Sequence, residues 1–184
     1  MSAFMRPRLR KFALTAHITF SVGWLGSVAS FFALAIAGLT SQDAQTVRGV
    51  YLAMVLTGWY VIVPLCIASL LTGLIMSLGS VWGLFRHYWV SMKFLITIVS
   101  TLILFGFTKT LNYLGDQARD ETLSIDNLQN PSPVLHAGLA LLALLATTTL
   151  SVYKPWGKTR YGRRKAKRDE SRQHELGLTE GNAQ

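Results

Sequence analysis

Apolar residues fill four long stretches of the chain, and polar or charged residues gather in the segments between them. Lys93 is the only Lys, Arg, Asp or Glu inside the stretches. A helix needs about 20 apolar residues to cross a bilayer, and each stretch meets that length. The pattern therefore predicts an all-α fold, a four-transmembrane-helix bundle. The four predicted spans cover residues 12–39, 50–78, 88–107 and 133–153.

Two features modify this simple picture. The first two stretches are longer than a bilayer requires, which predicts tilt or an extension into the interfacial region. Pro64 lies in the middle of the second stretch. Because proline lacks an N–H and its ring collides with the preceding turn, we expect a kink there.

The distribution of charge predicts how the helices are oriented. Of the 18 Lys and Arg residues, 13 lie in two flanks, at residues 6–11 and 154–172, and the connection with Arg86 is also basic. The connection at 108–132 carries four acidic residues against two basic ones. Basic segments stay on the cytoplasmic side. Both termini are therefore predicted to be cytoplasmic (N-in/C-in), in a multi-pass protein of the cell inner membrane.

The chain is expected to divide at the end of the fourth span. Residues 1–153 form the bundle, and residues 154–184 form a basic, mostly disordered cytoplasmic tail. The net charge of +9 flanks apolar spans, so anionic lipid headgroups fit the tail better than nucleic acid does. The simpler alternative is that the tail only sets the topology.

Composition excludes several classes of protein. Hydrophobic residues make up 51% of the chain and charged residues 15%, too apolar for a soluble enzyme or a disordered chain. Cys66 is the single cysteine, so one chain forms neither a disulfide nor a cysteine-based zinc site.

Two ionisable residues inside the spans are candidates for chemistry. His17 and Lys93 lie at similar distances from the cytoplasmic ends of spans one and three, roughly 8 Å deep at about 1.5 Å per residue. Ionisable groups in a bilayer usually face the bundle interior. Ser21 shares the His17 face, and Thr97, Ser100 and Thr101 continue the Lys93 face. The alternative is that Lys93 snorkels to the interface and that His17 is a hydrogen-bonded packing residue.

Small residues at four-residue spacing predict close helix packing. Such pairs let backbones approach in lipid, within one bundle or between protomers, so a homo- or hetero-oligomer could form through these faces. The pairs are Gly23 with Ser27, Gly26 with Ser30, and the series Ser69, Gly73 and Ser77.

Short motifs give the chain a family resemblance over roughly residues 10–110. The chain resembles a family of uncharacterised bacterial four-span integral membrane proteins in the segment His17–Gly26, in Leu71-Thr72-Gly73-Leu74, in the block Trp82–Val90 and in Lys93. The layout is more distantly similar to the bacterial membrane protoporphyrinogen oxidase family and to copper-resistance D-type membrane proteins.

The resemblance to the oxidase family implies a cofactor. In that family the matching histidine and lysine are implicated in haem binding and activity. This marks His17 as an axial ligand of haem iron, and Lys93 as a ligand or a propionate or substrate partner, with haem b as the cofactor. The family has a histidine two residues before the lysine, whereas Ser91 stands here. That difference favours haem binding over the oxidase activity.

Three functions follow as hypotheses. The first is a haem-associated redox protein of the membrane that uses His17 and Lys93. The second is a non-enzymatic scaffold or partner subunit that uses the small-residue faces and the basic tail. The third is a small-molecule transporter with a hinge at Pro64. The sequence assigns neither a substrate nor a catalytic residue.

Overall fold

The chain folds into long helices, and the part of it that the structure describes contains no β-strand. In this computed structural model the described residues are 6–79, 87–124, 128–153, 157, 159–164, 168 and 171. Four helices are long and apolar enough to cross a membrane. The predicted all-α fold is confirmed. The connection with Trp82 and Arg86 and most of the predicted basic tail lie outside the described residues.

The first half of the bundle consists of two helices joined by a tight turn. Helix α1 covers Pro7–Thr40 and begins with a proline, which is well suited to the first helical turn. The second is continuous over 36 residues and comprises α2 (Ala44–Thr57), a π-helix, η1 (Gly58–Ile62), and α3 (Val63–Gly79). Asp43 caps α2 by accepting hydrogen bonds from the Thr46 backbone and hydroxyl. These bonds lower the pKa of the Asp43 carboxyl, and the bond from the hydroxyl has the larger effect.

The second half has one long and one short helix. Helix α4 covers Tyr88–Arg119, and α6 covers Ser132–Tyr153. The sequence predicted that the third span ends at Phe107, at the first charges, but the helix continues for twelve residues. It continues because Leu111, Leu114 and Ala118 repeat at helical spacing and are buried. Beyond α6, residues 160–164 are helical.

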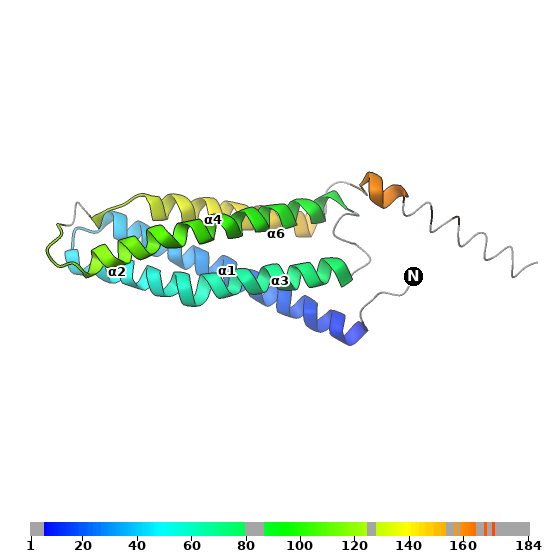
Figure 1. The fold of residues 1–184 in the computed structure, drawn as a ribbon, viewed down its shortest axis with the longest axis horizontal. Coiled ribbons are helices and arrows are strands. Elements are labelled where there is room, and N and C mark those ends of the chain that lie inside the picture. The colour runs from blue at the N-terminus through cyan, green and yellow to red at the C-terminus, as the bar shows by residue number, and fades with distance from the viewer. Residues whose placement is uncertain are drawn as a thin grey trace, which may run out of the picture.

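The contacts between the helices define their order around the bundle axis. Figure 1 shows the bundle from the side. Helix α1 packs against α2, α3 and α6, and α4 packs against the same three helices. Among the described residues α1 and α4 share no close backbone contact, so they are diagonal partners. At one end of the bundle, α1 and α4 begin and α3 and α6 end. We call it the terminal end. The opposite end, with the α1–α2 turn and the α4–α6 connection, is the loop end.

Pro64 is accommodated by a change of helix type. The π-helix η1 ends at Ile62, two residues before it, and the Val63 N–H donates to the carbonyl of Gly58, five residues earlier. Proline cannot donate the next bond, and a wider turn moves its ring away from the preceding carbonyls. The structure thus places a π-helix at the position where the sequence predicts a kink.

Two glycines, one at the start of η1 and one in α4, let the continuous helix of α2 and η1 approach α4 closely. A Cβ on Gly58 would lie 2.5 Å from Leu111 Cδ2, and one on Gly115 would lie 2.6 Å from Val55 Cγ2. Both distances are far below an ordinary carbon–carbon contact. These glycines therefore set the spacing of the two helices near the loop end.

Arg48 of α2 links this helix to the end of α4 and to the connection that follows it. Its guanidinium donates hydrogen bonds to the backbone carbonyls of Ala118, at 3.2 Å, of Asp120, and of Leu123, at 2.7 Å. The last carbonyls of a helix have no partner within the helix, so this side chain caps α4. The Asp120 carboxyl accepts hydrogen bonds from the Thr122 hydroxyl and backbone N–H, and these bonds, in that order, lower the pKa of this carboxyl.

Candidate functional site

Polar side chains from all four membrane helices gather in the half of the bundle nearest the terminal end. They are half-buried or buried, and they lie beyond the main apolar cluster, which ends on this side near Trp24 and Cys66. We call this region, defined by those side chains, the polar half. It comprises His17 and Ser21 on α1, Ser69 and Thr72 on α3, Lys93 and Thr97 on α4, and Thr147 and Ser151 on α6.

The hydrogen bonds of His17 indicate that its Nδ1 carries a proton. Its Nδ1 lies 3.1 Å from the Thr72 hydroxyl oxygen, and that hydroxyl lies 2.6 Å from the Ala68 carbonyl. A hydroxyl has one proton, and a carbonyl can only accept. The Thr72 proton therefore goes to Ala68, and His17 Nδ1–H donates to Thr72. In the neutral ring, Nε2 then carries the free electron pair.

Gly73 provides the surface against which this ring lies. A Cβ at Gly73 would be 3.0 Å from His17 Cε1 and 3.7 Å from Nε2. One turn away, the Ser21 and Ser69 hydroxyls are 2.8 Å apart. Two members of the predicted small-residue series on α3, Ser69 and Gly73, therefore face α1 beside His17 and Ser21.

Lys93 bonds to the neighbouring helix α6. Its ammonium donates to the Ser151 hydroxyl at 2.6 Å, and that hydroxyl donates to the Thr147 carbonyl at 2.7 Å. One of the three ammonium N–H groups is engaged in this way. Within the described ranges no carboxylate lies at ion-pair distance from Lys93. The two other N–H groups of the Lys93 ammonium thus remain as donors for a further acceptor.

His17 and Lys93 lie in the same half of the bundle, as the sequence predicts. They project from the diagonal helices α1 and α4, and each bonds to a different neighbour, α3 or α6. The structure thus places the two groups in one half of the bundle without a direct hydrogen bond between them.

The remaining hydroxyls of the predicted polar stripe serve the helices themselves. Thr97 donates to the Lys93 carbonyl at 2.9 Å, and Thr101 donates to the Thr97 carbonyl at 2.7 Å. Thr101 also contacts Cys66 Sγ at 3.2 Å. Hydroxyls in apolar helices often bond in this way. Thr147, Thr148 and Thr149 do the same on α6.

His136 does not take part in this site. It lies near the loop end, where Nδ1 is 2.9 Å from the Ser132 carbonyl and the ring stacks on Phe107. The described residues contain no group of three histidine, cysteine or carboxylate side chains placed to hold a metal ion.

Sequence reasoning missed the two residues that hold the candidates in place. Thr72 and Ser151 are ordinary small polar residues in apolar spans, and their importance follows only from which helix faces which. The available signal was that each lies near the terminal end of its span, at the expected depth of His17 and Lys93. No family model, curated protein or solved structure matches the chain.

Proposed function

We propose that the polar half is the redox centre of a membrane protein, with His17 as the axial ligand of haem b. The observation that carries the proposal is the hydrogen bond from His17 Nδ1–H to Thr72, which leaves the electron pair on Nε2. Metal-binding histidines usually have this arrangement, with the second ring nitrogen donating to an oxygen that orients the ring.

The residues of the polar half fit such a group. Nε2 of a neutral imidazole is a common haem ligand, and the free donors of Lys93 suit a carboxylate such as a propionate. When bound, haem supplies one-electron chemistry. Thr72 orients the ring, Gly73 leaves it room, and Lys93 offers positive charge to the anionic edge.

Orientation is part of the same proposal. We place the bundle in the inner membrane with the terminal end in the cytoplasm. Arg8, Arg10 and Lys11 are exposed in the first turns of α1, and Arg160 and Arg163 are exposed beyond α6. Basic side chains on one side of a membrane protein favour the cytoplasmic face and anionic headgroups.

The test is the absorption spectrum of the detergent-purified protein before and after dithionite. We expect a Soret band with sharp reduced bands at about one haem per chain, and its loss in the His17→Ala variant. His136→Ala is the matched control, because that histidine lies at the other end of the bundle. Full haem content in His17→Ala, or a colourless protein from haem-replete cells, would refute the proposal.

A second candidate function, a partner subunit, is favoured by a small-residue face that the bundle does not use. Gly23 packs against Leu65, whereas Gly26 and Ser30 are exposed and no side chain lies within 4 Å of a Cβ at Gly26. Close helix association in lipid uses such pairs. We expect Gly26→Ile to reduce self-association in detergent, measured by light scattering. Gly106→Ile, at an equally open glycine of α4, should leave it unchanged.

A further inference from the structure

The four membrane helices differ in length by more than a bilayer accounts for. Helix α6 has 22 residues, about 33 Å at roughly 1.5 Å per residue, which matches a hydrocarbon core of about 30 Å. The other three have 32 to 36 residues. They exceed α6 by ten to fourteen residues, so roughly 15–20 Å of helix remains to be placed.

Contacts between the helices show that much of this surplus lies at the loop end. The Phe107 and His136 rings stack with their centroids 4.5 Å apart, so these residues share a level. One turn farther toward the loop end are Leu111 on α4 and Ser132, the first residue of α6. Leu111 lies against Gly58. The start of α6, Leu111 and Gly58 therefore define one plane across the bundle.

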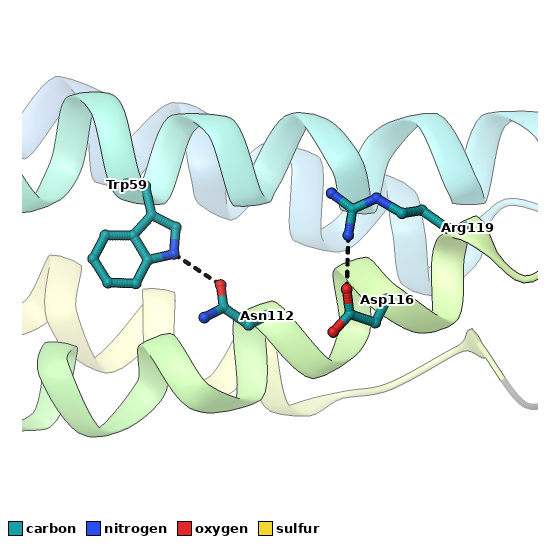
Figure 2. Close-up of polar contacts among 4 residues, drawn as sticks. All are labelled: Trp59, Asn112, Asp116 and Arg119. Atoms are coloured by element: carbon teal, nitrogen blue, oxygen red, sulfur yellow. Dashed lines mark hydrogen bonds and ion pairs between the residues drawn. The ribbon is translucent and has the colours of Figure 1, made fainter.

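Aromatic side chains are exposed at this plane. Trp59 is 39% exposed, Tyr60 77% and Tyr113 59%. The Trp59 indole N–H donates to the Asn112 side-chain oxygen at 2.8 Å, as Figure 2 shows. Tryptophan and tyrosine concentrate where the bilayer meets water, and an exposed amide such as that of Asn112 is costly in hydrocarbon. Asp116 and Arg119, farther along α4, form an exposed ion pair.

Packing differs on the two sides of the plane. Of the seven largest side chains with under 2% exposure, five lie beyond it at the loop end: Tyr51, Met54, Leu114, Leu128 and Val47. On the other side the apolar cluster ends near Trp24 and Cys66, and beyond these residues hydroxyls and His17 link α1 to α3. Burial of apolar side chains stabilises structure in water but not against lipid. The most completely buried large side chains therefore gather at the loop end.

We propose that the loop end is an aqueous helical cap, and that the bilayer edge on this side follows Trp59, Tyr60 and Tyr113. These three side chains and Asn112 form a surface for the glycerol and headgroup region of phospholipids. The cap comprises α2, the last turns of α1 and α4, and the described residues of the connection. The second span then begins near Gly58 rather than at Val50, and the surplus needs no steep tilt.

Cysteine labelling tests the position of the edge. In a Cys66→Ala background, single cysteines replace Leu56, which is 59% exposed on α2, and Leu71, which is 54% exposed on α3. Open membrane fragments are treated with a charged maleimide, so that both membrane faces are accessible. Thiolates form in water and not in hydrocarbon. We expect Leu56→Cys to react about ten-fold faster, or more, than Leu71→Cys.

Two further variants keep the test decisive. Gln45→Cys, exposed at the start of α2, reports labelling in water, and Leu139→Cys, 67% exposed on α6, reports labelling in lipid. Equal, slow labelling of Leu56→Cys and Leu71→Cys would place the bilayer edge closer to the loop end than Leu56 and would overturn the proposal. Fast labelling of Leu71→Cys and Leu139→Cys would overturn it as well. Neither outcome depends on whether haem is bound.

Discussion

An Arg48→Met variant is expected to unfold at a markedly lower temperature than the natural protein. Arg48 donates to three backbone carbonyls at the end of α4 and in the segment that follows. A hydrogen bond to a charged group contributes about 1.5–3 kcal/mol, so losing this partly exposed set should cost about 3 kcal/mol or more. For a chain of this size that corresponds to a decrease of roughly 6–12 °C in the melting temperature.

The control for this measurement is Arg119→Met. Arg119 bonds Asp116 at 2.7 Å, but both side chains are largely exposed. An exposed ion pair contributes about 1 kcal/mol or less. If thermal unfolding in the same detergent shows the same small shift for both variants, Arg48 is not a cap of α4.

Replacing Gly115 with valine is the second change expected to have a large effect. A Cβ at this position would lie 2.6 Å from Val55 Cγ2 and 3.7 Å from Val55 Cβ. Val55 is β-branched and stiff at χ1. Its side chain therefore cannot easily move aside, and the backbone must shift to relieve the clash. Overpacking of this kind costs typically about 1–3 kcal/mol, and α2 must also separate from α4. We expect a melting temperature lower by roughly 4–10 °C.

Gly106→Val provides the comparison, because both glycines lie inside α4 and no atom lies within 4 Å of a Cβ at Gly106. The substitution there should change the melting temperature little. A Val55→Ala change added to Gly115→Val should restore part of the lost stability by removing the methyl groups that clash. Equal effects of valine at positions 106 and 115, without rescue, would contradict the proposed close approach.

The course of the helices was largely predictable, but their ends were not. The absence of charge marks apolar spans well, because charged side chains are costly in lipid. Beyond Phe107 that signal stops, at Lys109, although the helix continues. A different pattern was present there: Leu111, Leu114 and Ala118 repeat at helical spacing. The end of the apolar stretch and the end of the helix are therefore separate features, whereas the prediction from the sequence placed both at Phe107.

The candidate site was predictable in its depth and only partly in its contacts. Counting residues along α1 and α4 correctly places His17 and Lys93 in the same half of the bundle. The order of helices around the axis decides which side chains meet, and one sequence does not contain it. Thr72 and Ser151 could therefore not be chosen over the other hydroxyls of their spans.

The π-helix before Pro64 has a consequence for changes in chain length. A five-residue turn holds one residue more than an α-helical path through the same space. Deleting one residue within 58–62 could rewind that turn as α-helix and keep Met54 and Cys66 facing inward. The same deletion in the middle of α3 would rotate everything after it by about 100°. Among homologous chains, single-residue insertions and deletions in this long helix should therefore concentrate at η1.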